Sequence, residues 1–187
     1  IMDKAGIDLQ IKNVEDLKKI KNRESIKVPL SYIGPLLKTT HPRSLSLDLT
    51  FDEPIITAAQ NMIIKADYPD QTKIKKSILV YSLTEILTEK IRSIIQRREP
   101  RDLYDVWRLF QDHLKDLNII ELSEIFYRKC SHRKINKVSL KDIFHERGIK
   151  ILERQWEIRL GHQMTNLPPF EKVLRETKRL LKKYIVI

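Results

Sequence analysis

The residues that could do chemistry in this chain are concentrated between positions 82 and 107. Lys90 lies on a segment of helical periodicity, on or beside its apolar face, where a lysine must extend to solvent or meet an anion. An arginine cluster and a D-x-x-D sequence, Asp102 to Asp105, follow shortly afterwards. Phosphate is the anionic ligand that such groups most often bind. The segment therefore indicates a site for a phosphorylated ligand.

The same residues also have a structural interpretation. Three arginines surround Pro100, as expected of a hydrated turn between two helices: Arg97, Arg98 and Arg101. Arg101 can form an ion pair with Asp105 at i,i+4 spacing. Asp102 suits the positive end of the second helix. Pattern alone leaves structural and catalytic roles open for both aspartates.

Asp48 is a candidate metal ligand on the clearest strand pattern of the chain, residues 44–51. Leucines and a phenylalanine alternate there with polar residues, so Asp48 points away from the leucine face. A carboxylate that projects from a strand commonly holds Mg²⁺ at a phosphoryl-transfer centre. Asp52 would share the face of Asp48 if the strand continued. The alternative is an exposed strand aspartate without function.

The net charge of +11 is unevenly distributed. Residues 126–187 carry 16 Lys and Arg against 6 Asp and Glu, whereas residues 1–125 carry 20 against 19. A positive excess confined to one segment favours a polyanionic partner, nucleic acid first, although a solubilising surface is the simpler alternative. The candidate contacts lie on one face of a basic amphipathic helix predicted over residues 170–184: Lys172, Arg175, Lys178, Arg179, Lys182 and Lys183.

The elements that would position these residues run from strands to helices. Strands are predicted over residues 26–33, 44–51 and 75–81, and a short helix over 14–21, while 55–66 is ambiguous. The sequence Asp67-Tyr68-Pro69-Asp70 predicts a turn.

Helical periodicity begins at Ser82, which with Glu85 fits a capping box. The bland interpretation of Glu85 and Glu89 is a capping glutamate and a solvated acidic face. Further helices are predicted over 101–113, 119–130, 139–146 and 149–160. Strands followed by helices indicate an α+β fold. We expect a sheet core over residues 1–81 and a helical region over 82–187.

Several classes of protein are disfavoured by what the sequence lacks. It contains neither G-x-x-x-x-G-K-[ST] nor G-x-G-x-x-G, which argues against P-loop and dinucleotide-binding folds. Cys130 is the single cysteine and lacks metal-ligand spacing with His132. Without a run of eighteen apolar residues or a secretory leader pattern, we expect a cytoplasmic protein that does not span the membrane.

The segment from Glu89 to Trp107 resembles the AbiEii/AbiGii toxin family of nucleotidyltransferases. Its sequence EKIR, then RREPRDLYDVW, is similar to the family pattern E-K-h-R-A-L followed by R-x-x-p-R-D-h-Y-D. The sequence LDLT at 47–50 resembles the earlier h-D-h-[ST] strand, and DYPD at 67–70 is also typical. The resemblance covers roughly residues 26–112.

The resemblance implies a DNA polymerase β-like nucleotidyltransferase fold and the toxin of a toxin–antitoxin or abortive-infection system, with roles in phage defence. It implies transfer of a nucleotidyl group from an NTP to an acceptor, tRNA or another RNA, with Mg²⁺ or Mn²⁺ as cofactor. A cognate antitoxin is an expected partner. The implied roles are metal binding by Asp48, nucleotide binding by Lys90 with Arg97 and Arg101, and catalysis by Asp102 supported by Asp105.

The chain departs from the family pattern in its first motif. The family has a Gly-Gly or Gly-Ser turn and then D-x-D on a strand, whereas this sequence contains no D-x-D. Ser44 and Ser46 stand where basic residues are common, with Arg43 displaced. Because one carboxylate binds magnesium weakly, we expect this polypeptide to be inactive unless an upstream segment supplies the D-x-D motif.

A second hypothesis, from another class, is a non-catalytic, degenerate nucleic-acid-binding module. It would use residues 126–187 and keep the transferase core as a scaffold. A G-[GS] turn and D-x-D in upstream coding sequence would favour the enzyme, whereas a genuine start at Met2 would favour the binding module.

Overall fold

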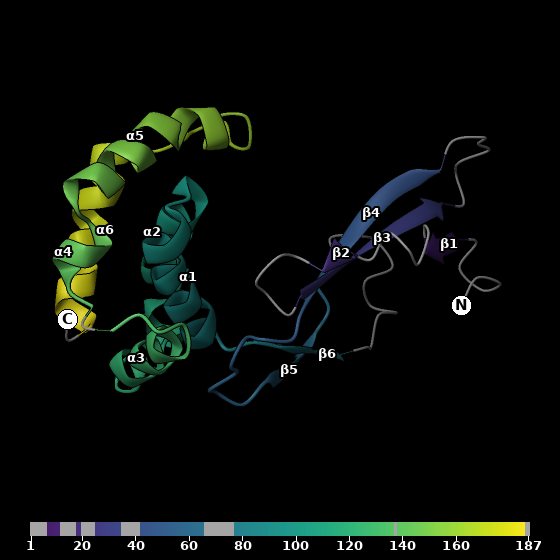
Figure 1. Cartoon of the computed structure of the whole chain (residues 1–187), viewed down its shortest axis with the longest axis horizontal. Helices are drawn as coiled ribbons and strands as arrows, with labels where there is room; N and C mark the ends of the chain where they lie inside the picture. The colour runs from purple at the N-terminus through teal and green to yellow at the C-terminus, as the bar shows by residue number, and fades with distance from the viewer. Residues whose placement is uncertain are drawn as a thin grey trace. The chain divides into compact units, whose positions relative to one another are not determined.

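The chain forms antiparallel strands first and helices afterwards (Figure 1). The computed structural model describes residues 7–11, 18–19, 25–34, 42–65, 77–136 and 138–185. The chain separates into two compact units, Ile1–Glu53 and Pro54–Ile187. The boundary lies before the one expected at residue 81, because a β-hairpin belongs to the second unit. The α+β class is confirmed. The division into a transferase sheet core over residues 1–81 and a helical region over 82–187 stays a prediction.

The first unit is built around a long central strand. Its strands are β1 (Asp8–Ile11), β2 (Lys18–Lys19), β3 (Ser25–Ile33) and β4 (Arg43–Thr50). Each of the other three pairs antiparallel with β3. The predicted strands at 26–33 and 44–51 are therefore confirmed. The leucines of β4 share a face with Val28 and Leu30 through the register, but they remain 44–49% exposed: Leu45, Leu47 and Leu49.

The helix predicted over residues 14–21 is wrong where it can be compared. Lys18 and Lys19 form β2 and pair with Lys27 and Ile26 of β3. An isolated helix of about two turns is marginal in water, so pairing with a long neighbouring strand outweighs a local capping signal. The rest of that predicted helix lies outside the described residues.

A hairpin opens the second unit. Its strands are β5 (Gln60–Ile63) and β6 (Ser77–Val80), paired antiparallel from Gln60 to Val80. This pairing assigns part of the ambiguous segment 55–66 to a strand and confirms the strand predicted at 75–81. The turn predicted at 67–70 lies outside the described residues.

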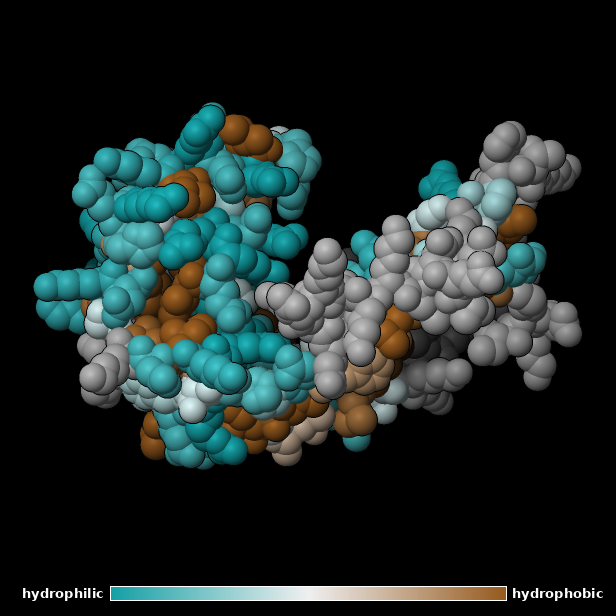
Figure 2. Space-filling view, in the orientation of Figure 1, coloured by the Kyte–Doolittle hydropathy of each residue, from teal (hydrophilic) through white to brown (hydrophobic). Residues whose placement is uncertain are grey.

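The remaining elements are helical, as predicted. They are α1 (Leu83–Arg97), α2 (Pro100–His113), the 3₁₀ turn η3 (Leu114–Asp116), α3 (Leu122–His132), α4 (Leu140–Ile143), α5 (Glu146–Leu160) and α6 (Phe170–Tyr184). Figure 2 shows a mostly hydrophilic surface over the visible face of these helices. Their apolar faces form one core, whose fully buried members include Leu87, Ile91, Ile94, Leu103, Val106, Phe126 and Val173.

Two indole groups attach the C-terminal helix and the segment before it to this core. Trp107 Nε1 on α2 donates to the Glu176 carboxylate on α6 over 2.7 Å. Trp156 Nε1 on α5 donates to the Pro168 carbonyl over 2.9 Å, just before α6 begins. Buried indole N–H groups need such acceptors, so these bonds fix the position of the basic helix against α2 and α5.

One buried hydroxyl of α6 leads to a stability prediction. Thr177 is fully buried, and its Oγ1 has no hydrogen-bond partner among the described residues. An unsatisfied buried polar group costs about 1–3 kcal/mol, so we expect Thr177→Val to raise the free energy of unfolding by about 1 kcal/mol. Urea denaturation followed by circular dichroism measures this difference.

Thr88 on α1 supplies the matched control. It is equally buried, but its Oγ1 donates to the carbonyls of Thr84 and Glu85 over 2.9 and 3.0 Å. Thr88→Val removes satisfied bonds and should lower stability. A stability gain of the same size in both variants would contradict the assignment of an unsatisfied hydroxyl at Thr177.

Candidate functional site

The N-terminus of α1 is capped by Ser82, whose Oγ accepts from the Glu85 N–H over 3.0 Å. The reciprocal half of the predicted capping box is wrong. The Glu85 carboxylate does not return to Ser82 but accepts from the N–H groups of Ile56 and Thr57 over 3.2 and 3.0 Å, and from Thr57 Oγ1 over 2.9 Å. Glu85 therefore holds the first residues of the second unit against α1.

Glu85 also forms a buried ion pair with Lys129 of α3. The Nζ–Oε1 distance is 2.7 Å, and each side chain is 2% exposed. Burial alone would raise the pKa of Glu85, but the hydrogen bonds from Lys129, Thr57 and Ile56 together outweigh burial and lower that pKa. Lys129 Nζ further donates to the Pro54 carbonyl over 3.2 Å. We call Glu85, Lys129 and the backbone of residues 54–57 the buried clasp.

The four residues of the sequence EKIR, positions 89–92, point in different directions from α1. Ile91 is fully buried in the core. Glu89 and Arg92 pair with each other, and Arg92 also contacts Gln96. Lys129 Nζ lies 3.5 Å from Glu89 Oε2, which joins this pair to the buried clasp. Glu89 and Arg92 therefore have structural partners, and Lys90 is the residue that turns toward α2.

Lys90 meets both aspartates of the D-x-x-D sequence. Its Nζ lies 2.5 Å from Asp105 Oδ2 and 3.5 Å from Asp102 Oδ1. Arg97, at the end of α1, donates from Nε and Nη2 to the two Asp102 oxygens over 2.6 and 2.7 Å. We call Lys90, Arg97, Asp102 and Asp105 the α1–α2 charge cluster.

Exposure separates the two aspartates of this cluster. The Asp102 side chain is fully buried, whereas the Asp105 side chain is 38% exposed. Lys90 and Arg97 are 26% and 37% exposed. The hydrogen bond to Asp102 raises the pKa of Arg97, so the guanidinium stays charged. The two cations, Lys90 and Arg97, and the Asp105 carboxylate are thus accessible to a ligand. The buried Asp102 carboxylate contacts both cations and orients them.

The helix order explains why these groups meet. Pro100 begins α2, where its missing N–H costs no hydrogen bond. Arg98 ends α1 in the left-handed conformation, with φ of 50°, and turns the chain sharply. Asp102 then falls in the first turn of α2, where the positive end of the helix favours a carboxylate.

The other two arginines around Pro100 lie elsewhere. Arg98 Nη2 is 2.9 Å from His145 Nε2 and links the α1–α2 corner to α5. Arg101 is exposed. The ion pair considered between Arg101 and Asp105 does not form in the described structure, because Lys90 reaches Asp105 from the adjacent helix. Nucleotide binding by Arg101 stays a prediction without a contact to support it.

Asp48 belongs to the first unit. It is exposed on β4, directly opposite Lys27 of β3. The strand ends at Thr50, so Asp52 lies beyond it and does not continue its alternation. Within the described residues, no three His, Cys, Asp or Glu side chains form a group that could hold a metal ion.

The six basic residues predicted to bind nucleic acid all lie on α6 without full burial. Three of them extend over aromatic rings: Lys172 over Trp107, Lys178 over Phe144 and Lys183 over Tyr184. Cys130, in contrast, is buried, and burial raises the pKa of its thiol to about 11. It therefore remains protonated at neutral pH and is a poor nucleophile.

Sequence reasoning missed Lys129, although the signal was present. Leu122, Ile125, Phe126 and Cys130 are buried on α3, and Lys129 occupies a position of the same apolar face. The criterion that singled out Lys90 applies equally to Lys129. A lysine at such a position indicates a buried acidic partner when its neighbours leave no route to solvent.

Comparison with known proteins supports the resemblance seen in these motifs. The chain matches the family described as nucleotidyl transferase AbiEii toxin, type IV TA system, over residues 4–176. No curated protein and no solved structure gave a significant match. Within the described residues, no helix combines the length and apolar character of a membrane span. Because the match covers nearly the whole sequence, the chain belongs to the AbiEii family of nucleotidyltransferase toxins from type IV toxin–antitoxin systems.

Proposed function

We propose that this protein transfers a nucleotidyl group from an NTP to an RNA acceptor, with tRNA as the first candidate, in the presence of Mg²⁺ or Mn²⁺. The observation that carries the proposal is the α1–α2 charge cluster. It presents Lys90 and Arg97 beside an accessible carboxylate, Asp105. Cations positioned next to a general base are what phosphoryl transfer requires from side chains.

Lys90 and Arg97 would bind the triphosphate. Lys90 Nζ already contacts Asp105, so an arriving phosphate would take over this ammonium and leave the Asp105 carboxylate available. Arg97 is held by two hydrogen bonds to Asp102, which fix the plane of its guanidinium, and its side chain remains 37% exposed. Fixed donors stabilise the charge that develops on phosphate oxygens without reorganising during the reaction.

The two aspartates would divide the remaining work. Asp105 would accept the proton of the acceptor hydroxyl as its oxygen bonds to the α-phosphorus, while the bond to the β-phosphate breaks and pyrophosphate leaves. Asp102 is fully buried and would act as a positioning residue for Arg97 and Lys90. The exposed fractions favour this order of roles over the reverse, in which Asp102 would be the base.

Asp48 would contribute one metal ligand. Its exposed carboxylate is the hard oxygen donor that Mg²⁺ prefers, and Mg²⁺ commonly binds through one or two carboxylates together with substrate phosphates. A metal ion held there would neutralise negative charge on a phosphate. A single carboxylate supplies part of such a site, and removal of the metal tests whether the activity depends on it.

Membership of the family implies a nucleotide substrate and a cognate antitoxin. We further propose that the antitoxin limits the activity in the cytoplasm and that the pair acts in phage defence. The basic face of α6 supports RNA as the acceptor, because the positive excess of the chain is concentrated in this C-terminal part.

The test is incubation of the complete gene product with labelled NTPs, Mg²⁺ and total tRNA. We expect labelled RNA in the wild type, no label after metal chelation, and a loss of about 100-fold or more in Asp105→Asn. Asp112→Asn on α2 is the matched control, because Asp112 forms a partly exposed ion pair with Arg108, away from the α1–α2 charge cluster. RNA binding without incorporation of any NTP would contradict the transferase and support the non-catalytic binding module.

A further inference from the structure

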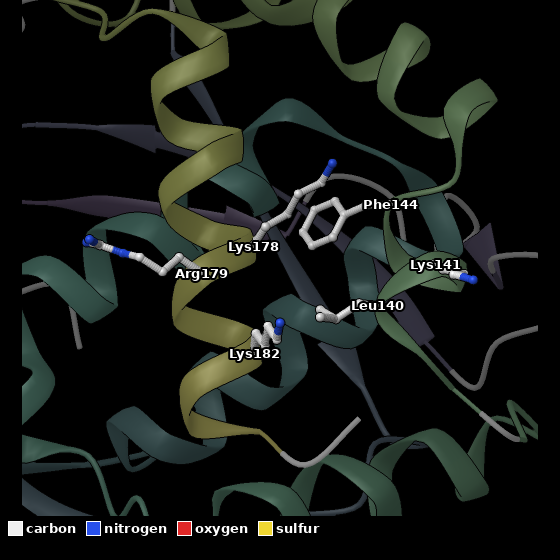
Figure 3. Close-up of a pocket in the computed structure, with 6 residues that line it drawn as sticks. All are labelled: Leu140, Lys141, Phe144, Lys178, Arg179 and Lys182. Carbon is white, nitrogen blue, oxygen red and sulfur yellow. The ribbon is translucent and has the colours of Figure 1, made fainter.

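A pocket of about 450 Å³ lies between α4 and α6. None of the residues that line it belongs to the α1–α2 charge cluster. Two apolar and four basic residues line it: Leu140, Lys141, Phe144, Lys178, Arg179 and Lys182. Figure 3 shows Lys178, Phe144, Leu140 and Lys182 between the two helices, while Arg179 and Lys141 extend to either side. We call this the α4–α6 pocket.

The cations of this pocket are not neutralised by neighbouring acids. Among the described residues, no carboxylate forms an ion pair with any of the four. Lys178 is half-buried, and its Nζ lies 5.5 Å from the centre of the Phe144 ring. The ring holds this ammonium at the pocket through a cation–π contact. Four uncompensated cations around one cavity create a strong local preference for a polyanion.

The floor of the pocket is apolar. Phe144 is only 6% exposed and lies in the core, so its position is fixed by packing. Leu140 lies one helical turn before it and widens the same surface. An apolar floor bordered by cations suits a nucleotide, whose base is apolar on its faces and whose phosphates are anionic. The volume is within the range of small-ligand pockets.

We propose that the α4–α6 pocket binds an unpaired nucleotide of the RNA acceptor. The base packs on Leu140, beside the Phe144 ring that Lys178 covers, and the flanking phosphates contact Lys178, Lys182 and Arg179. The floor offers no hydrogen-bonding groups to base edges, so binding is tolerant of base identity. A paired base must first leave its stack, which costs free energy, so single-stranded RNA binds better than duplex. The identity of this RNA as the acceptor rests on the proposed function.

The experiment measures binding of a fluorescent 12-nucleotide single-stranded RNA to the full chain by anisotropy, at several KCl concentrations and without NTP. We expect the triple variant K178A/R179A/K182A to bind at least about tenfold more weakly at 0.1 M salt. Its salt dependence should also become shallower by about 2 in the log–log slope, because each phosphate contact to a single strand contributes about 0.7. The control is R147A/K150A/R159A, which removes three exposed cations from α5.

The apolar floor is tested separately by Phe144→Leu, which removes the aromatic ring and keeps an apolar side chain in the core. We expect weaker RNA binding, by about fivefold, with an unchanged salt slope. Thermal unfolding checks that the variant is folded. If it is not, Leu140→Ser on the half-buried edge of the pocket replaces it, with the same expected loss.

Three results would contradict RNA binding in the α4–α6 pocket. One is an equal loss of RNA affinity in the α6 and α5 triple variants, which would indicate binding to diffuse surface charge. Another is equal competition by duplex RNA, and the third is equal competition by poly-glutamate, which would indicate an acidic protein partner.

The two proposals fail in different ways. Normal RNA binding by the pocket triple variant, together with NTP incorporation by the wild type, would refute the pocket alone. Pocket-dependent RNA binding without incorporation would refute the transferase alone.

Discussion

Replacing Lys129 with methionine is expected to lower the free energy of unfolding by about 3 kcal/mol. The Glu85–Lys129 pair is 98% removed from solvent on both sides, since each side chain is 2% exposed. Removing the lysine leaves a buried carboxylate whose remaining partners are the N–H groups of residues 56 and 57 and the Thr57 hydroxyl. Removing one partner of a buried ion pair destabilises a protein far more than replacing both partners by apolar residues, because it leaves an unpaired buried charge.

Urea denaturation followed by circular dichroism measures this effect, with two comparison variants. Lys150→Met removes the lysine of an exposed pair with Glu146 on α5 and should change stability by no more than about 0.5 kcal/mol. The double variant E85M/K129M should recover part of the loss, because it removes the unpaired buried charge, although it also takes the acceptor from the N–H groups of residues 56 and 57. A loss in the double variant larger than in K129M would contradict this account.

The same pair gives a pH dependence with a defined sign. The pKa of Glu85 is lowered in the folded protein, so at acidic pH this side chain binds fewer protons in the folded state than in the unfolded state. Its contribution to stability is therefore fully present above the ordinary glutamate pKa of about 4.3 and is lost as pH falls through the lower folded value. Glu85→Gln should remove this part of the acid sensitivity. An unchanged pH profile in that variant would assign the acid sensitivity to other carboxylates.

Lys90→Met is expected to lower NTP incorporation by about 100-fold or more while leaving the fold intact. Lys90 is 26% exposed and its pair with Asp105 is partly solvated, so its loss should cost no more than about 1 kcal/mol of stability. The ammonium, in contrast, is the point charge nearest the accessible carboxylate of the cluster. The K90M variant should therefore lose NTP incorporation and keep nearly the stability of the wild type.

Asp102→Asn should lose both properties together. The asparagine keeps the shape but leaves the Arg97 guanidinium without its buried carboxylate. We expect reduced stability in urea denaturation together with reduced incorporation, because Arg97 and Lys90 lose the group that orients them. Lys115→Met in η3, an exposed lysine away from the cluster, is the control for both measurements. Full incorporation by K90M would refute phosphate binding by Lys90.

Local patterns in the sequence predicted the main helices and two long strands because their periods are strong. The alternation of leucines identified β4, and the apolar spacing after Ser82 identified α1. The short helix predicted at 14–21 is wrong at Lys18 and Lys19, the part of it that the structure describes, because these residues pair with Lys27 and Ile26 of another strand. The local periodicity of apolar residues does not reveal pairing with a strand elsewhere in the sequence.

The candidate site was predicted in part. Lys90, Arg97, Asp102 and Asp105 were all singled out from residue types and spacing, and the structure brings these four together. Their order of exposure does not follow from the D-x-x-D spacing, because it depends on how α2 packs against α1. The family resemblance alone gave Asp102 the catalytic role.

The sequence by itself determined the α+β class, the family, the basic character of α6 and the identity of the charged residues, because these follow from composition, period and local motifs. Only the tertiary structure decided which charges meet. It turned Glu85 from a capping residue into the buried partner of Lys129, and it placed Phe144 beneath Lys178. These contacts join residues 44 and 34 positions apart, and the packing of whole helices sets such distances.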